Sequence, residues 1–348
     1  MVEHILILGA GPTALTTALA LTTYLPAPQP RISLFEIRPA LSTIGGAVNL
    51  TPKALRYLHH LGVYDLFVER RIGAECQIIE LFNKYSGAKY AELDSRGSEG
   101  KGMGRTEGDR FFARRVVRSE LVGTMLEVLK QKNGVNVVFG KKVISIEETN
   151  TAVTLTFEDG STVSGDCLTA SDGIHSAVRS LLIDPQRTPT YTGISVAMAT
   201  ATLPPGTPPP PWTTTGLVSS RRGSLMCSYF QPDRRAHYIG AVMEIADVGS
   251  REGWKARGED QEAIKRDLLE RFRSESMPAN EAILEAVGDW TLYPVFALPK
   301  GGKWVSRGGR CVLLGDAAHA VSVTPDLRVS MRLIRADAAA RRVHRHLH

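Results

Sequence analysis

The hydrophobic positions at the start of the chain follow a strand–helix–strand pattern. Residues 5–8 are all apolar, which is typical of a strand buried on both faces. Apolar and small residues continue with helical spacing over 13–23, and 31–36 predicts a second strand. A proline-rich linker at 26–30 separates helix from strand. The pattern predicts a βαβ unit.

Further along, the period of the apolar positions changes. Residues 118–132 have helical spacing and end at Asn133-Gly134, and 52–61 predicts a shorter helix. Residues 135–139 and 167–170 predict strands, and 154–163 predicts a hairpin around Glu158-Asp159-Gly160. The glycine-rich stretch 97–108 predicts a loop. Alternating runs at 194–201, 224–230 and 237–243 predict an antiparallel sheet, and 260–272 a helix.

These elements predict an α/β protein in which a discontinuous, Rossmann-like domain carries an inserted antiparallel β-sheet domain. We expect the first domain to comprise residues 1–75, 109–182 and 296–325. The inserted domain would then comprise 76–108 and 183–295, and residues 326–348 would form a basic tail.

Composition changes this picture little. Of 348 residues, 43% are apolar and 22% charged, as in ordinary globular proteins. Four widely spaced cysteines without a CxxC pair predict no metal site and a reducing, cytoplasmic location. No apolar run reaches the ~20 residues that span a bilayer. The net charge is +6, of which residues 328–348 supply +5 (six Arg, one Asp); without interleaved aromatic residues this segment does not indicate nucleic-acid binding.

Glycines mark the first strand-to-helix turn. Gly9, Gly11 and Ala14 form G-x-G-x-x-A directly after the first strand. Such a turn lets the backbone approach a pyrophosphate, and the helix N-terminus favours negative charge. Glu36 lies 22 residues after Ala14 at the end of the second strand, where an acid accepts hydrogen bonds from ribose hydroxyls. The pattern predicts a dinucleotide site without saying which dinucleotide.

Two further turns follow apolar strands. Asp172 and Arg179 belong to the pattern D-G-x-x-S-x-x-R, and Gly315-Asp316 follows the apolar run 311–314. An aspartate at the end of a strand can bind a ribityl hydroxyl, which flavin has and NAD lacks. In this order the three motifs resemble those of the class A FAD-dependent monooxygenases, the aromatic hydroxylases of the para-hydroxybenzoate and salicylate hydroxylase type. The resemblance covers most of residues 1–325.

The resemblance implies a role for each motif residue. The FAD pyrophosphate would be bound by Gly9, Gly11 and Ala14, the adenosine end by Glu36 and Arg38, and the flavin would lie beside Gly45, Gly46 and Ala47. Arg118 would counter phosphate charge, Asp172 and Arg179 would serve both FAD and NAD(P)H, and the ribityl chain would bind Gly315 and Asp316. Tyr229, on a strand of the inserted sheet, is the candidate catalytic residue if its phenol points toward the flavin; a packed strand tyrosine is the alternative.

The resemblance also implies the reaction. FAD would be the resident cofactor, NADPH or NADH the transient reductant, and O₂ the source of one oxygen atom placed on an aromatic or polyketide-like small molecule. Another flavin oxidoreductase, an oxidase or a halogenase, is the alternative, although the Trp-x-Trp-x-Ile signature of halogenases does not occur. These motifs do not predict the oligomeric state.

The sequence departs from the family after Thr324-Pro325. Where the family has a glycine-rich turn whose backbone lies against the flavin, this chain has Arg328, and no glycine follows Gly315. A side chain there would obstruct close approach of the backbone to a ligand. We therefore expect residues 326–348 to pack poorly and FAD to be held weakly, so a catalytically impaired, truncated paralogue is a further alternative.

Overall fold

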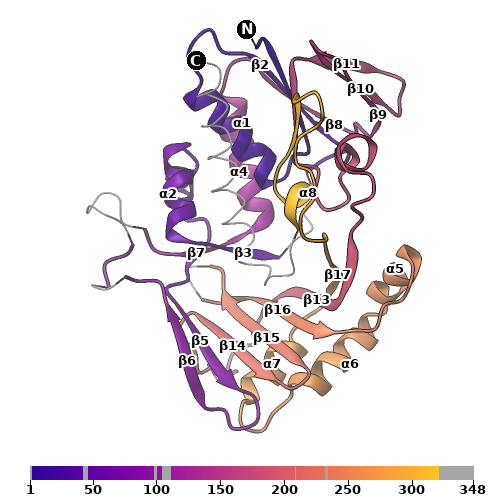
Figure 1. The fold of residues 1–348 in the computed structure, drawn as a ribbon. Coiled ribbons are helices and arrows are strands. Elements are labelled where there is room, and N and C mark those ends of the chain that lie inside the picture. The colour runs from indigo at the N-terminus through magenta and orange to yellow at the C-terminus, as the bar shows by residue number, and fades with distance from the viewer. Residues whose placement is uncertain are drawn as a thin grey trace.

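The computed structural model describes residues 2–41, 46–97, 100–103, 111–207, 209–231 and 234–320. Figure 1 shows two units, one above the other, each built around a sheet. The upper unit contains a parallel sheet with helices packed on it, and the lower unit contains a mainly antiparallel sheet. The predicted α/β class, with a Rossmann-like part and a separate antiparallel sheet, is confirmed.

The parallel sheet is centred on β1 (His4–Leu8), and all five residues of this strand are buried. Residues 5–8 of β1 are all apolar because neighbouring strands pair on both sides of the strand and other layers cover both of its faces. All neighbouring strands in this sheet run parallel, so their carboxyl ends lie at one edge. In spatial order the strands are β18 (Cys311–Leu313), β12 (Cys167–Ala170), β1, β2 (Arg31–Glu36) and β8 (Val135–Phe139).

Different layers cover the two faces of this sheet. Ile5 and Ile7 of β1 pack in one apolar cluster with the helices, whereas Leu6 and Leu8 pack with a small second sheet. The helices are α1 (Pro12–Tyr24), α2 (Pro52–His60), α3 (Tyr64–Glu69) and α4 (Arg118–Lys130). The small sheet consists of β9 (Val143–Glu148), β10 (Val153–Phe157) and β11 (Thr162–Gly165), and its β10–β11 pair confirms the predicted hairpin.

The lower sheet has seven strands, and helices cover only one of its faces. Leu225, Cys227 and Ile239 of the sheet pack against Leu268 and Phe272 on that face. The other face is turned toward the upper unit (Figure 1). In spatial order the strands are β17 (Thr291–Ala297), β13 (Thr190–Thr202), β16 (Ala236–Glu244), β15 (Gly223–Tyr229), β14 (Thr215–Ser220), β5 (Ile78–Asn83) and β6 (Lys89–Asp94). The helices are α5 (Arg251–Glu259), α6 (Gln261–Phe272) and α7 (Pro278–Glu285).

Short elements join the two units. A three-stranded sheet, β3 (Ala47–Leu50), β7 (Arg114–Val117) and β4 (Ala74–Glu75), lies between them (Figure 1). The π-helical turn η2 (Arg179–Ile183) leads into β13, and β17 leads back toward β18 and α8 (Asp316–His319). β17 continues to residue 297, beyond the boundary placed after residue 295, and the division into domains stays a prediction.

Several expectations fall outside the described residues. These include the tail from residue 326 with Arg328, and, within the loop expected at 97–108, residues 98–99 and 104–108. Among the helices that the structure describes, none combines the length and the apolar character needed to cross a membrane.

Candidate functional site

The carboxyl edge of the parallel sheet brings the three sequence motifs together. The Ser171 amide, after β12, donates to the Leu8 carbonyl at 2.8 Å, and the Leu314 amide, after β18, donates to the Ala170 carbonyl at 2.8 Å. A Cβ added at Gly315 would lie 2.8 Å from Thr13 Oγ1 at the start of α1. The motifs from opposite ends of the chain are thus in contact at the edge where α/β sheets bind their ligands.

A cavity of about 290 Å³ lies at this edge. Of the residues that the motifs singled out, those lining it are Gly9, Gly11, Glu36, Arg38, Arg118, Asp172 and Asp316. It therefore extends from the end of β2, across the N-terminus of α1, to the turns after β12 and β18.

Gly9 and Gly11 have different roles in the turn between β1 and α1. Gly9 has a φ of +102°, and a Cβ there would lie 2.6 Å from the Ser171 carbonyl oxygen, so the position requires glycine. Gly11 is the N-cap of α1, with an ordinary φ of −77° and no side-chain cap. Among described atoms, a Cβ there would approach only Arg118 Nη2, at 4.0 Å. The uncapped amides of α1 and the Arg118 guanidinium therefore face one open space, which suits a pyrophosphate.

Glu36 is buried at the end of β2 and binds the glycine turn itself. Its Oε2 accepts a hydrogen bond from the Ala10 amide at 2.9 Å, and its Oε1 accepts one from the Arg38 amide at 3.0 Å. The two bonds fix the carboxylate at the cavity wall. A carboxylate has about four lone-pair sites, so acceptor capacity remains for ribose hydroxyls.

The Asp172 carboxylate is only partly satisfied. Its Oδ2 accepts a hydrogen bond from the Ala177 amide at 2.7 Å, whereas its Oδ1 is buried and has no hydrogen-bond partner among the described residues. Burial raises the pKa of this carboxyl group. Because a buried polar atom without a partner costs free energy, a ligand hydroxyl donating to Oδ1 would be stabilising. Together with the phosphate and ribose positions, this orphaned oxygen fits FAD.

Gly46 and Ala47 lie beside the cavity rather than in its wall. The Arg118 amide donates to the Gly46 carbonyl at 3.1 Å, and Ala47 of β3 pairs with Val117 of β7. A Cβ at Gly46 would collide with the ring of Tyr238 on β16. Gly46 therefore lies between Arg118 and Tyr238 of the seven-stranded sheet.

Three other motif residues shape the site or fall outside it. Ala14 is fully buried on α1 against the apolar core, and Gly315 has a φ of +58° at the N-cap of α8. Gly45 lies outside the described residues.

Arg179 does not line the cavity. Its side chain is buried, and its guanidinium donates to the carbonyls of Ile174, Arg187 (3.0 Å) and Ala317 (2.9 Å). This geometry gives no support to direct binding of FAD and NAD(P)H by Arg179. Instead, the side chain joins the turn after β12 to the turn that contains Asp316.

Tyr229 lies on the face of the seven-stranded sheet that α5, α6 and α7 cover. It packs against the same apolar cluster as Cys227, and its ring centroid is 4.5 Å from that of His237. Met226 and Tyr238 lie on the opposite face, beside Arg115 of β7. Tyr229 thus packs as a strand tyrosine on the helix-covered face, and this geometry gives no support to a catalytic role.

Sequence reasoning missed several residues at or beside the cavity. Lys141 and Lys142 line it. The lysines follow β8, so the rule that ligands bind at the carboxyl ends of parallel strands could have found them. Tyr293 of β17 lies near the cavity: burial raises its pKa, while the neighbouring Arg118 and Arg38 act in the opposite direction. No sequence signal marks Tyr293, because the alternation of residues along a strand does not say which face of the sheet will lie against the upper unit.

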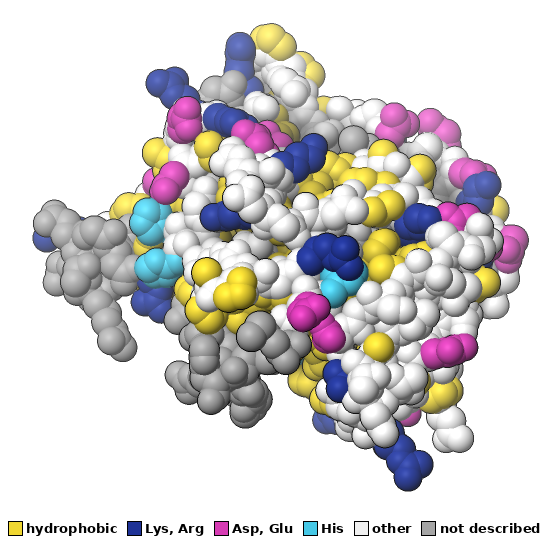
Figure 2. All heavy atoms as spheres, turned by 90° about the horizontal axis from the view of Figure 1, so that it is seen from above, with side chains coloured by type: hydrophobic (Ala, Val, Ile, Leu, Met, Phe, Trp, Pro, Cys, Tyr) yellow, Lys and Arg dark blue, Asp and Glu magenta, His cyan; other side chains and the backbone are white. Residues whose placement is uncertain are grey.

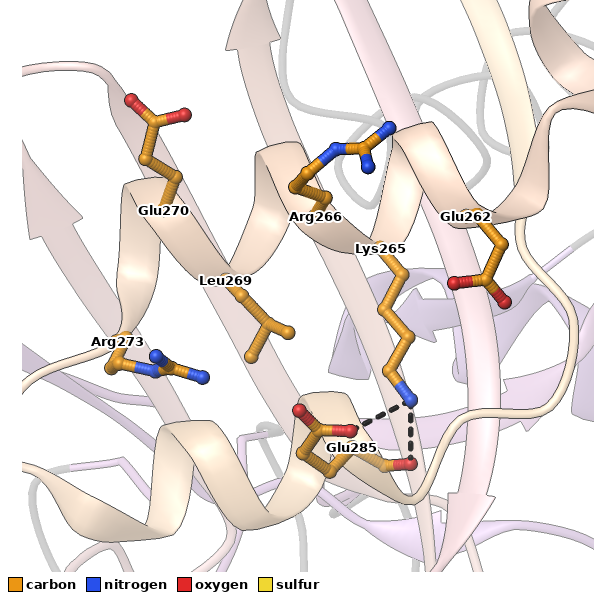
Figure 3. Close-up of a pocket in the computed structure, with 7 residues that line it drawn as sticks. All are labelled: Glu262, Lys265, Arg266, Leu269, Glu270, Arg273 and Glu285. Atoms are coloured by element: carbon orange, nitrogen blue, oxygen red, sulfur yellow. Dashed lines mark hydrogen bonds and ion pairs between the residues drawn. The ribbon is translucent and has the colours of Figure 1, made fainter.

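A larger cavity, of about 670 Å³, is a surface groove between α6 and α7 (Figure 3). Several of its charged lining residues are already ion-paired: Lys265 Nζ lies 2.7 Å from Glu285 Oε2, and Arg273 lies 3.0 Å from Glu281, just outside the lining. Figure 2 likewise shows acidic and basic side chains interspersed over the described part of the upper face. Paired, solvated charges of this kind do not indicate a binding site.

The glycine turn, the acid at the end of β2 and the two aspartates at one sheet edge are the arrangement expected of a dinucleotide-binding flavoprotein. The chain belongs to the family described as FAD binding domain, whose model matches residues 3–325.

Similar proteins agree with this family. The FAD-dependent urate hydroxylase of Klebsiella pneumoniae is 28% identical over 92% of this chain and 76% of its own length. Salicylate hydroxylase of Pseudomonas putida is 26% identical over 90% and 71%. The crystal structure of Klebsiella pneumoniae HpxO with FAD and uric acid has a TM-score of 0.76 at 21% identity, covering 98% of this chain and 83% of that one, and shows the same fold. The resemblance to FAD-dependent aromatic hydroxylases is confirmed.

We expect Glu36→Ala to weaken FAD binding by roughly 1–3 kcal/mol, the usual loss for hydrogen bonds to a charged acceptor. The ribose would lose its acceptor, and the amides of Ala10 and Arg38 would lose theirs. Titration of the apoprotein with FAD measures the effect. Glu285→Ala removes an exposed carboxylate on α7 and is the control. Unchanged affinity in folded Glu36→Ala would place the ribose elsewhere.

Proposed function

We propose that the protein is an FAD-dependent monooxygenase that uses NAD(P)H and O₂ to hydroxylate an aromatic or polyketide-like small molecule. The observation that carries this proposal is a cavity lined by residues from both ends of the chain. Its wall includes the N-terminus of α1 with Arg118, the carboxylate of Glu36, and Asp172, whose buried Oδ1 has no hydrogen-bond partner among the described residues. Family membership supports FAD, and relatives named for hydroxylating urate and salicylate support the reaction class.

The chain's own residues would bind and orient the cofactor. The N-terminus of α1 and Arg118 would neutralise the pyrophosphate, and Glu36 would accept hydrogen bonds from the ribose. Asp172 Oδ1 and Asp316 would accept hydrogen bonds from the ribityl hydroxyls. Bound FAD supplies electron transfer and oxygen activation, and the protein supplies position and exclusion of water.

The substrate would lie between the upper unit, which would bind FAD, and the seven-stranded sheet. On this side Arg115 is fully buried, with its guanidinium carbon 5.7 Å from the Tyr238 ring centroid and one nitrogen 3.7 Å from Met226 Sδ. Thr215 Oγ1 and Ser228 Oγ, both buried, lie 2.7 Å apart. Gly46 packs against Tyr238, so these groups adjoin the segment that would lie beside the flavin. Its mixture of apolar, hydroxyl and cationic groups away from water suits an electron-rich ring.

Purified protein reconstituted with FAD tests the proposal. We expect NADPH or NADH to be consumed faster when a phenolic substrate is present, and the hydroxylated product to carry label from ¹⁸O₂. A panel of single-ring phenols and aromatic acids, each assayed with both reductants, covers the proposed substrate class.

Three outcomes would contradict the proposal. Label arriving from water would exclude a monooxygenase. Oxidation of NAD(P)H without a labelled product from any compound in the panel would favour a flavin oxidase. FAD binding without turnover would favour the impaired paralogue.

A further inference from the structure

We propose that Arg187 is a positioning residue of the FAD site: it fixes the turn containing Asp316 relative to the seven-stranded sheet. This inference rests on the proposed function. Arg187 is 9% exposed and is not among the described residues that line the cavity. It acts through the backbone that carries Asp316.

Within the part of the chain that the structure describes, the hydrogen bonds of the Arg187 guanidinium all go to backbone carbonyls. Its Nη1 donates to the Ala318 carbonyl at 2.8 Å, while its Nε and Nη2 donate to the Pro299 carbonyl at 3.1 and 2.8 Å. The planar fork of the guanidinium lets one side chain serve two separate segments at once. A lysine, with a single nitrogen, cannot reproduce this pattern.

Arg179 supports the same turn through the preceding carbonyl. Its Nη1 donates to the Ala317 carbonyl at 2.9 Å, and its Nε donates to the Arg187 carbonyl at 3.0 Å. Two buried guanidinium groups therefore bind the consecutive carbonyls of Ala317 and Ala318, directly after Asp316. Buried arginines are tolerated where such hydrogen bonds are made, so the pair specifies one position for the turn.

The surroundings of Arg187 are shaped to admit it. Gly302 has a φ of +93°, and a Cβ there would lie 2.5 Å from Arg187 Cδ. A side chain at residue 302 would therefore displace the guanidinium from the carbonyls.

The position of Arg187 in the chain gives these contacts their consequence. Arg187 lies in the connection from η2 to β13, and Pro299 lies in the connection from β17 to β18. These are two of the segments that join the upper unit to the seven-stranded sheet (Figure 1). The Leu298 amide also donates to the Ala320 carbonyl at 2.8 Å. Arg187 thus holds both connections against the turn that contains Asp316. The distance between Asp316, the proposed ribityl ligand, and the seven-stranded sheet therefore depends on Arg187.

Arg187→Gln, Arg187→Lys and a matched control test the inference. Arg310 is the control, because its guanidinium also binds backbone carbonyls, of Asn150 and of Asp166 (2.9 Å), but it precedes β18 at the amino edge of the parallel sheet. In the apoprotein we expect Arg187→Gln to speed hydrogen exchange of the Ala318 and His319 amides, which donate to the Gly315 carbonyl, by about tenfold. The Kd for FAD should rise by about tenfold, the loss that one hydrogen bond to a charged group commonly carries. Arg187→Lys should lie between Arg187→Gln and the wild type, and Arg310→Gln should change neither measurement.

Each result decides the inference. Unchanged exchange at the turn in folded Arg187→Gln overturns it, as does a uniform rise in exchange over both sheets, which would indicate a purely structural role. If Arg187→Gln fails to fold, Arg187→Lys decides by the same two readouts. A wild-type protein that binds no FAD would refute the proposed function, whereas the exchange measurements would still decide whether Arg187 fixes the turn.

Discussion

Replacing Gly11 by valine is expected to lower the affinity for FAD by about 100-fold, the loss that corresponds to one or two hydrogen bonds to a charged group, while the protein still folds. Gly11 has a φ of −77°, which any residue adopts, and the nearest described atom to an added Cβ is Arg118 Nη2 at 4.0 Å. The protein can therefore accommodate the side chain. The isopropyl group would instead occupy the space between α1 and Arg118, where the pyrophosphate is proposed to bind. Loss of a good N-cap residue should cost only about 1 kcal/mol of stability.

Two measurements separate binding from folding in this variant. Titration of the apoprotein with FAD gives the affinity, and thermal unfolding of the same apoprotein gives the stability. Gly258→Val is the matched control, because Gly258 lies on α5 with no described atom within 4 Å of an added Cβ. If Gly11→Val bound FAD as tightly as the wild type, the N-terminus of α1 could not be the phosphate site.

The part of the site that the sequence predicted is the part set by local structure. A strand, a glycine turn and a helix are consecutive, so the φ requirement at Gly9 and the open space at Gly11 follow from the residues themselves. Glu36 could be found because its spacing places it at the end of β2. What the pattern could not show is that both Glu36 oxygens also bind amides of the turn, at Ala10 and Arg38.

The part that the sequence could not predict depends on which way side chains face. Arg179 belongs to a recognisable motif, yet it turns inward to the Ala317 carbonyl because that carbonyl comes from a segment 138 residues away. Tyr229 alternates correctly on a strand, but alternation cannot tell which face α5, α6 and α7 will cover. Tyr238, nine residues further on, lies on the face toward Arg115. Tertiary packing alone distinguishes the two tyrosines.

Gly9→Ala is expected to act on the fold itself and to lower the free energy of unfolding by about 2–4 kcal/mol, the combined cost of an unfavourable φ and overpacking. The added Cβ would lie 2.6 Å from the Ser171 carbonyl oxygen and 2.9 Å from its carbon. Both atoms are backbone, and the Ser171 amide is held by the Leu8 carbonyl, so no side-chain rotation can relieve the contact. The clash falls between the ends of β1 and β12, where the motifs meet.

Denaturant unfolding of Gly9→Ala and of Gly160→Ala, measured in parallel, separates the cost of the unfavourable φ from the cost of overpacking. Gly160 has a φ of +80° in the hairpin between β10 and β11, but no described atom lies within 4 Å of an added Cβ. The Gly160→Ala variant should lose only the part of the free energy of unfolding that comes from the unfavourable φ, about 1 kcal/mol. The excess loss in Gly9→Ala then measures the closeness of β1 to the turn after β12. Equal losses in the two variants would mean that the backbone around Ser171 can shift to accommodate a methyl group at residue 9. The close contact between the motifs would then not explain why residue 9 is glycine.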